Sequence, residues 1–228
     1  NIKKDDVFLA LRGKKLHGRM FSNNAFRNGA SLILTDRFNK RIPKNAQIIK
    51  EKPLELFTRV SEKVRISSGA KVVAITGSCG KTSLKEMVAN TLEKFGDTCC
   101  SEKSYNNFIG VPLSLFNMKN KDSFGVFEVG MDKKGEIDSL TKLIKPDLGV
   151  ITNITYAHAK NFNDIEGIAK AKAEIIYNIK KNGCLITNRD DNFYSFFRNI
   201  SKKLKLNICS FSMKNKNADV FLQKIIKK

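Results

Sequence analysis

The chain has 228 residues, 41% of them hydrophobic and 28% charged, which is the composition of a soluble globular protein with an ordinary core. No apolar run approaches the ~18 residues of a membrane-spanning helix, so we expect no membrane span. The formal net charge of +20 would suit a nucleic-acid surface, but the lysines are spread along the whole chain and acidic residues interrupt most clusters. We therefore expect small polyanionic substrates rather than nucleic acid.

The cysteines and the first residues indicate a cytoplasmic protein. Residues 1–6 contain no apolar signal segment. They also lack a starting Met, so we expect the natural chain to begin further upstream. Five thiols lie scattered without a Cys-x-x-Cys pair or metal-binding spacing, which fits a reducing compartment: Cys79, Cys99, Cys100, Cys184 and Cys209.

Residues 1–70 are expected to form a small N-terminal α/β domain. A short helix is predicted to end at Gly29, and a longer helix with a broad apolar face begins at Pro53. Strands are predicted at the short apolar segments 7–11, 31–35 and 47–49.

Residues 71–228 alternate strand and helix patterns, which predicts a mostly parallel, doubly wound central domain with helices on both faces of its sheet. The helix after the first strand is expected to turn Leu84, Met87 and Val88 inward. Further strands are expected at 124–130, 148–153 and 184–188. Polar residues stop these strands, and ligands bind at the carboxyl ends of strands in such sheets.

The stretch 71–83 carries the main functional motif. An apolar strand runs into the turn Gly77-Ser78-Cys79-Gly80 and then into Lys81-Thr82-Ser83 at the start of a helix. This order aims backbone N–H groups and a helix N-terminus at a phosphate. Lys81 would reach the terminal phosphates and the Thr82 hydroxyl would bind magnesium. The first glycine of the usual pattern should fall at 75, where the chain has Ile75, so an ordinary strand–helix turn is the alternative.

Glu128 and His158 are candidate metal ligands. Glu128 lies inside an apolar strand, where a lone carboxylate is costly unless it is paired or binds a metal. An acidic residue on a strand beside a phosphate loop is a usual magnesium partner. His158 follows another strand, and its position alone leaves open a second metal ligand or an ordinary loop histidine.

Lys172 is predicted to face inward, because it lies seven residues after Ile165 and four after Ile168 on one helical stripe. An inward lysine must find an acid or lose its charge. Spacing alone favours an ion pair with Glu174 or another acid. A pKa lowered by burial would instead leave a neutral amine that reacts with CO2 to form a carbamate.

The motifs together resemble the Mur ligases. The phosphate loop of that family shares the displaced glycine found here. The resemblance extends into the N-terminal domain, and within the family it is greatest to the ligases that add D-alanyl-D-alanine. The segments that carry it, in chain order, are 6–13, 21–30, 75–83, 106–112, 128–130 with 135–137, 152–158, 169–175 and 188–191.

The resemblance implies an ATP-dependent ligase of peptidoglycan precursor synthesis, which joins D-alanyl-D-alanine to UDP-N-acetylmuramoyl-tripeptide through an acyl phosphate. It implies a monomer whose residues 1–70 bind the UDP substrate and whose residues 71–228 bind ATP. Lys81 and Lys172 would be catalytic. The nucleotide would contact Gly77, Ser78, Cys79, Gly80, Lys81, Thr82, Ser83 and, less firmly, Asn188. Two Mg²⁺ ions would be held by Thr82, Glu128, His158 and a carbamylated Lys172.

Three departures from the family pattern are visible. Cys79 replaces the usual Asn, and the run 17–20 differs at a place that would contact the UDP substrate. The chain also lacks the family's later His-Asn segment and C-terminal domain, so we expect a fragment that binds nucleotide weakly without completing ligation. Rival interpretations are another Mur ligase, an amide ligase resembling folylpolyglutamate synthase, and a nucleic-acid-stimulated P-loop ATPase.

Overall fold

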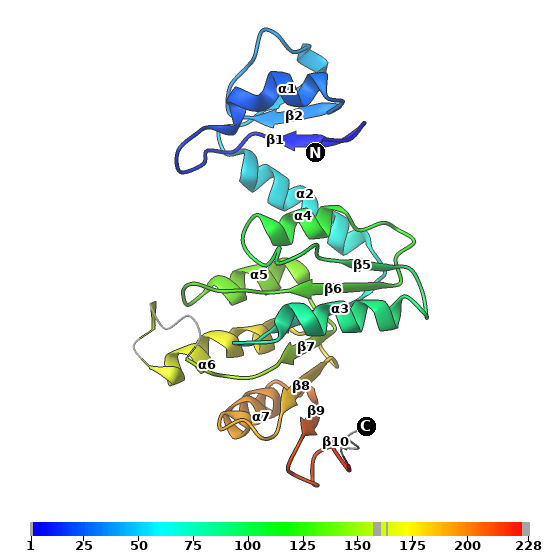
Figure 1. Ribbon diagram of the computed structural model, residues 1–228, viewed down its shortest axis with the longest axis vertical. Coiled ribbons are helices and arrows are strands. Elements are labelled where there is room, and N and C mark those ends of the chain that lie inside the picture. The colour runs from blue at the N-terminus through cyan, green and yellow to red at the C-terminus, as the bar shows by residue number, and fades with distance from the viewer. Residues whose placement is uncertain (1, 157–160, 163, 225–228) are drawn as a thin grey trace. The chain divides into compact units, whose positions relative to one another are not determined.

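The computed structural model describes residues 2–156, 161–162 and 164–224 (Figure 1). It divides into two compact units, Asn1–Val60 and Ser61–Lys228. The division falls inside helix α2 (Pro53–Ser67), whereas the sequence places the boundary after that helix, at residue 70.

The first unit is a three-stranded parallel sheet in the order β1-β2-β3. Its core gathers Ile33 of β2 with Ala25, Ala30, Ile42 and Ala46. The predicted strands and short helix are confirmed. The elements are β1 (Val7–Leu9), the 3-10 turn η1 (Gly18–Phe21), α1 (Ser22–Arg27), β2 (Leu32–Thr35), η2 (Lys44–Ala46) and β3 (Gln47–Ile49).

Within the described residues, the second unit is a seven-stranded sheet in the order β10-β9-β8-β7-β4-β6-β5, and every neighbouring pair is parallel. The expected parallel α/β architecture is confirmed. The strands are β4 (Lys71–Thr76), β5 (Thr98–Cys100), β6 (Phe124–Glu128), β7 (Leu148–Ile151), β8 (Cys184–Asn188), β9 (Asn207–Ser212) and β10 (Val220–Phe221). The helices are α3 (Lys81–Leu92), α4 (Gly110–Phe116), α5 (Glu136–Ile144), α6 (Ile165–Ala173), its 3-10 continuation η4 (Glu174–Asn178) and α7 (Tyr194–Lys203).

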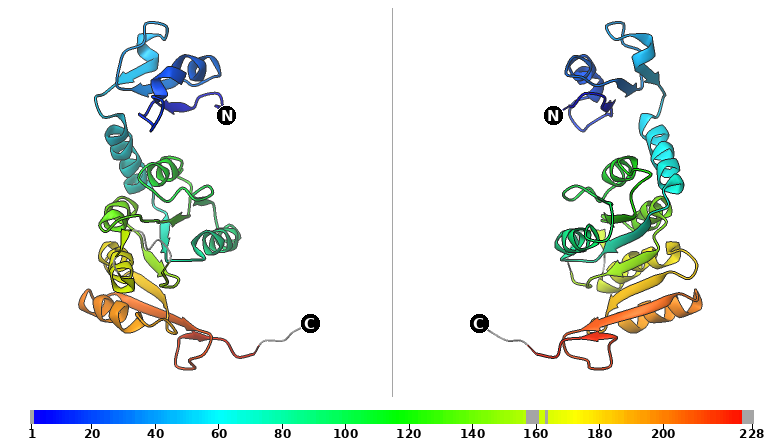
Figure 2. Two further views of the ribbon diagram at one scale, coloured as in Figure 1. Left: turned by 60° about the vertical axis from the view of Figure 1, so that its left-hand side comes forward. Right: turned by 90° about the vertical axis from the view of Figure 1, so that its right-hand side faces the viewer.

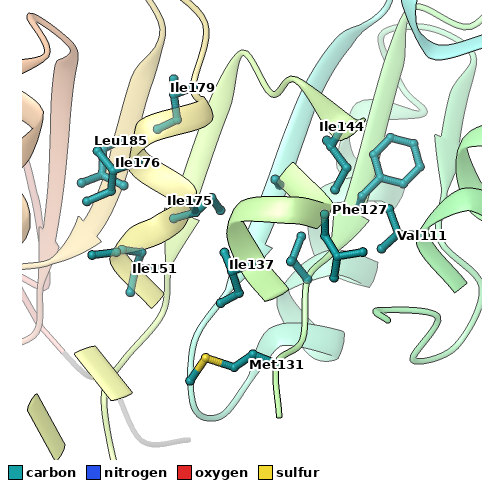
Figure 3. Close-up of a cluster of buried hydrophobic side chains, with 14 of the residues drawn as sticks. Val111, Phe127, Met131, Ile137, Ile144, Ile151, Ile175, Ile176, Ile179 and Leu185 are labelled. Atoms are coloured by element: carbon teal, nitrogen blue, oxygen red, sulfur yellow. The ribbon is translucent and has the colours of Figure 1, made fainter. Parts of the chain in front are cut away.

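Strand β4 is buried on both faces, as its continuous apolar run predicts. Val72 and Ala74 point into a large cluster with the helices α4 to α7, whereas Val73 and Ile75 point into a smaller cluster against α3. Figure 2 shows α3 on one side of this sheet and the helices α5, α6 and α7 on the opposite side. Figure 3 shows part of the large cluster, to which α5 contributes Ile137 and Ile144 and the strands contribute Phe127 and Ile151.

Two details of the helices differ from the sequence-based expectation. Met87 is 67% exposed, and the fully buried side chains of α3 are Lys85 and Ala89. Leu84 and Val88 do pack against the smaller cluster, as expected, so Met87 is the one residue of the predicted stripe that points outward. The apolar stripe that begins at Ile165 continues in the sequence to Ile179 and predicts one helix, but the helix that begins after the N-cap Asp164 tightens into a 3-10 turn at Glu174.

The polar residues that follow the strands lie along one edge of the sheet. Ile75 pairs with Glu128 and Thr76 pairs with Ile151. Ile151 in turn pairs with Thr187, next to Asn188. In parallel sheets this carboxyl edge is where ligands bind, so the register brings the candidate residues to the expected place. Across the described residues, none of the helices combines the length and the apolar composition needed to cross a bilayer.

Candidate nucleotide and metal site

The turn between β4 and α3 is built on two glycines whose backbone lies in the left-handed region. Gly77 has φ +146° and Gly80 has φ +80°. A Cβ atom at position 77 would lie 1.8 Å from the Thr152 hydroxyl oxygen. Position 77 therefore has no room for a side chain, and the displaced glycine of the motif is a steric requirement of this fold.

Residues 152–155, which follow β7, brace this turn through hydrogen bonds. The Ser78 N–H donates to the Asn153 carbonyl at 2.9 Å, and the Ser78 hydroxyl donates to the Thr155 carbonyl at 3.0 Å. The Cys79 N–H donates to the Asn153 side-chain oxygen at 3.0 Å, and the Thr152 hydroxyl donates to the Cys79 carbonyl at 2.7 Å. The loop is therefore held before any ligand arrives, which lowers the entropic cost of binding. Sequence reasoning assigned no bracing role to residues 152–155.

Lys81 lies over this turn at the N-terminus of α3. Its ammonium donates to the carbonyl oxygens of Gly77 at 2.9 Å and Ser78 at 3.3 Å. A positive charge, a helix N-terminus and a rigid glycine turn are the parts that bind a phosphate chain. Of the other expected loop residues, Ser83 is exposed on the first turn of α3.

Glu128 is 1% exposed at the end of β6, and neutral donors hold both its carboxylate oxygens. The Thr82 hydroxyl donates to one oxygen at 2.7 Å, and the Asn106 amide donates to the other at 2.7 Å. Among the residues that the structure describes, no cation lies in ion-pair contact with Glu128.

A buried carboxylate without a counter-charge fits a hard divalent cation, which prefers oxygen ligands. Thr82 and Glu128 supply such oxygens side by side. The donor set thus suits Mg²⁺ better than a soft metal. Among the described residues, no group of three or more His, Cys, Asp or Glu side chains is placed to hold a metal ion by itself.

Lys172 faces inward, as its position on the helical stripe predicts. Its side chain is 2% exposed, and its ammonium donates to the Gly77 carbonyl at 3.0 Å. Burial, reinforced by the positive charge of Lys81, lowers the pKa of Lys172 to about 7. A large fraction of Lys172 is therefore neutral at physiological pH.

The ion pair that spacing favours between Lys172 and Glu174 is absent. The helix tightens at Glu174, and the carboxylate turns to the start of α5, where it accepts hydrogen bonds from the N–H groups of Gly135 at 2.7 Å and Asp138 at 3.1 Å. A carboxylate at a helix N-terminus satisfies otherwise unpaired N–H groups and the helix dipole. Glu174 thus stabilises α5 and leaves Lys172 without an acidic partner in the described part of the chain.

One cavity of about 550 Å³ brings the main candidates together. Lys81 and Thr82 come from α3, Glu128 from β6 and Lys172 from α6. The remaining wall is formed by residues to which the sequence analysis gave no individual role, chiefly Ser104, Asn106, Asn107, Phe108, Ile109, Asp132 and Glu136. The functional roles expected of Lys81, Thr82, Glu128 and Lys172 stay predictions.

Other predicted site residues do not line this cavity: Gly77, Ser78, Cys79, Gly80 and Ser83 belong to the adjoining turn and the start of α3. Asn188 ends β8 on the same edge of the sheet, but it does not line the cavity, and its side-chain oxygen accepts the Asp190 N–H at 2.9 Å. His158 lies outside the described residues.

Comparison with known proteins agrees with this geometry. The chain is 36% identical over 221 residues to a Buchnera aphidicola (subsp. Baizongia pistaciae) protein named UDP-N-acetylmuramoyl-tripeptide–D-alanyl-D-alanine ligase, covering 96% of this chain and 47% of that protein. It is 34% identical over 214 residues to the protein of the same name from Escherichia coli, covering 93% and 46%. The chain therefore spans about half the length of these relatives.

Solved structures of MurF proteins share the fold. The structure from Acinetobacter baumannii superposes with a TM-score of 0.84 at 30% identity, covering 96% of this chain and 47% of that one. The structure of MurF from Thermotoga maritima in complex with ADP gives a TM-score of 0.80 at 28% identity, covering 94% and 49%. The family described as the Mur ligase middle domain matches residues 75–228. Since that match covers more than half of the chain and contains every element of the cavity, this protein belongs to the Mur ligase family.

Proposed function

We propose that this chain forms the UDP-substrate-binding and ATP-binding part of a cytoplasmic ligase that adds D-alanyl-D-alanine to UDP-N-acetylmuramoyl-tripeptide during peptidoglycan synthesis. The observation that carries the proposal is the convergence of the helix start after the glycine turn, a partly buried hydroxyl–carboxylate pair and a buried lysine of lowered pKa around one cavity. The substrates are those in the names of the relatives.

The chemistry balances as two displacements. A carboxylate oxygen of the tripeptide forms a bond to the γ-phosphorus of ATP, the bond to the bridging oxygen breaks, and ADP leaves. The amine of D-alanyl-D-alanine then bonds to the acyl carbon, the bond from that carbon to the phosphate oxygen breaks, and phosphate and a proton leave. Such transfers depend on positioning and charge neutralisation rather than on covalent help from the protein.

The residues of the cavity supply those two needs. The braced turn at Gly77 orients the phosphate chain, and Lys81 adds a positive charge beside it. Thr82 and Glu128 would hold Mg²⁺. When bound, the ion neutralises charge on the phosphate oxygens.

Lys172 would carry a carbamate. Its neutral amine nitrogen bonds to the carbon of CO2 and loses a proton, which leaves a carboxylate in place of a cation. Burial and the pKa of about 7 support this reaction, as does the engagement of Glu174 elsewhere. The new carboxylate would serve a second Mg²⁺, for which His158 is the other predicted ligand.

The first unit would bind the UDP substrate. It contains a cavity of about 570 Å³ whose basic lining suits a diphosphate. In that lining, His17 and Arg19 both contact the Asp36 carboxylate, at 3.3 and 3.5 Å. The run 17–20 departs from the family pattern, and the Asp36 carboxylate holds two of its side chains, His17 and Arg19. The cationic residues of the cavity are Arg12, Lys14, Lys15, Arg19 and Arg37.

Two measurements test the proposal. Isothermal titration calorimetry should show ADP binding to the 228-residue chain that tightens when Mg²⁺ is added. A protein that also carries the second half found in the relatives should form UDP-N-acetylmuramoyl-pentapeptide, ADP and phosphate in equal amounts from the two substrates and ATP. Equal activity with a folate substrate, or ATP hydrolysis that is raised by DNA or RNA, would contradict the assignment.

A further inference from the structure

Lys85 is a fully buried charged residue that the chemistry above does not use. It lies on α3, one helical turn after Lys81, and its side chain is 0% exposed. Its ammonium donates to the carbonyl oxygens of Ser101 at 2.5 Å and Lys103 at 2.9 Å, and it lies 2.8 Å from the Glu86 carboxylate. An ammonium removed from water is retained only where such acceptors replace its hydration.

The two carbonyl groups belong to residues 101–106, the segment that leaves β5 and leads to the cavity. Lys103 in this segment has φ +45°, a left-handed conformation that a residue with a side chain adopts only when its surroundings hold it. The segment therefore has a local tendency to relax. Lys85 ties both sides of that strained turn to α3.

The same segment holds Glu128. The Ser101 hydroxyl oxygen accepts the Glu128 N–H at 3.2 Å, and the Asn106 amide donates to the carboxylate at 2.7 Å. The opposite carboxylate oxygen accepts the Thr82 hydroxyl. Thr82 and Lys85 lie one turn apart on α3, so the contacts close a ring from α3 through the segment and Glu128 back to α3.

We propose that Lys85 is a positioning residue for the magnesium site: its buried ammonium fastens residues 101–106 to α3 and so holds the Glu128 carboxylate opposite Thr82. This inference rests on the proposed role of Thr82 and Glu128 in binding Mg²⁺. It adds that the helix carrying the phosphate-binding Lys81 also sets the distance between the phosphate loop and its acidic partner.

The test compares ADP affinity in EDTA with ADP affinity in Mg²⁺, measured by calorimetry on the 228-residue chain. Lys85→Met removes the ammonium and keeps an unbranched side chain. We expect this variant to bind ADP in EDTA within about twofold of the unsubstituted chain, because the phosphate loop is intact, but to lose roughly tenfold of the tightening caused by Mg²⁺. An equal loss with and without Mg²⁺ would overturn the inference, because it would mean general damage to the loop.

Two control variants sharpen the comparison. Lys121→Met removes an exposed lysine paired with Asp97 and should change neither affinity. Glu86→Gln removes the exposed partner of Lys85 but keeps both carbonyl contacts, so the Mg²⁺ effect should persist. If circular dichroism shows that Lys85→Met does not fold, Lys85→Gln decides, because it keeps a hydrogen-bond donor at the buried position but removes the ammonium that reaches both carbonyl groups, and it should lower the Mg²⁺ effect alone.

The outcomes separate this inference from the proposed function. If Mg²⁺ does not tighten ADP binding to the unsubstituted chain, the proposed metal site fails and the inference fails with it. If Mg²⁺ tightens binding equally in the unsubstituted chain and in folded Lys85→Met, the metal site stands and the positioning role of Lys85 is wrong.

Discussion

Lys81 and Lys172 donate hydrogen bonds to the same atom, the carbonyl oxygen of Gly77, at 2.9 and 3.0 Å. Lys172 reaches this atom from a helix 95 residues further along the chain. Two ammonium groups on one acceptor repel each other, and the more deeply buried of the two, Lys172, is the one whose pKa is lowered to about 7. Under the proposed function, the closeness of these lysines would link phosphate binding at Lys81 to the protonation of Lys172.

The first prediction concerns stability as a function of pH. The pKa of Lys172 is lowered from 10.5 to about 7 in the folded chain, so between these values the unfolded chain binds the additional proton. The contribution of Lys172 to the free energy of unfolding of the unsubstituted chain must therefore rise with pH between about 7 and 10.5. We expect Lys172→Met to be more stable than the unsubstituted chain at pH 7 by roughly 1–3 kcal/mol, and the difference to shrink by up to ~1 kcal/mol per pH unit as the pH rises towards 10.

Urea unfolding of both chains in bicarbonate-free buffer from pH 6 to pH 10 measures this difference. Taking the difference between the two chains cancels the titration of other groups. Lys170→Met is the matched control, since Lys170 is exposed and pairs only loosely with Glu166 at 3.6 Å, and it should show no such pH dependence. A difference that is independent of pH would mean that Lys172 stays protonated in the folded chain.

The second prediction concerns the role found for Glu174. Replacement by Gln keeps the shape of the side chain but removes the charge at the N-terminus of α5, where Gly135 and Asp138 donate to it. We expect Glu174→Gln to lower the free energy of unfolding by about 1–2 kcal/mol. Glu166→Gln removes an exposed carboxylate from the same helical segment and should cost less than ~0.5 kcal/mol. Chemical denaturation compares the two, and equal losses would show that capping by Glu174 adds no stability.

Part of this site could be predicted from the sequence because it depends on local pattern. The strand–turn–helix order placed Lys81 and Thr82, the apolar run around Glu128 marked an unusual carboxylate, and helical periodicity turned Lys172 inward. Each of these inferences needs only a window of a dozen residues and the period of a helix or strand.

The rest depends on contacts between segments far apart in the chain. No local pattern shows that Glu174 turns towards α5, that residues 152–155 brace the phosphate loop, or that Lys85 rather than Met87 is buried on α3. Lysine is among the residues least often buried, so a pattern reading assigns it to the surface. Its burial becomes intelligible only when the two carbonyl groups at 101 and 103 are seen next to it.

The third prediction tests the glycine at position 77. Gly77→Ala combines a strained backbone with a clash against the Thr152 hydroxyl. We expect it to lower the free energy of unfolding by about 2–4 kcal/mol and to weaken ADP binding at least tenfold. Thr152→Ala in the same chain removes the contact with the hydroxyl but leaves the Thr152 Cβ at 3.0 Å, its backbone nitrogen at 3.1 Å and the backbone strain, so it should restore only part of the stability. Gly69→Ala, where a Cβ meets no atom within 4 Å, should change stability by less than ~1 kcal/mol.

The fourth prediction uses the cysteine that stands in the phosphate loop. Cys79 is exposed, whereas burial raises the pKa of Cys99 to about 12 and that of Cys100 to about 11, so at pH 7.5 their thiolate fractions are on the order of 10⁻³ or less. Mass spectrometry after brief treatment with iodoacetamide should find Cys79 alkylated well before those two thiols. ADP with Mg²⁺ should slow alkylation of Cys79 at least fivefold, because phosphates bound by the loop cover it. Cys79→Asn, which introduces the residue usual in the family, should bind ADP as well as the unsubstituted chain does. Alkylation of Cys79 at the same rate with saturating ADP would place the nucleotide elsewhere.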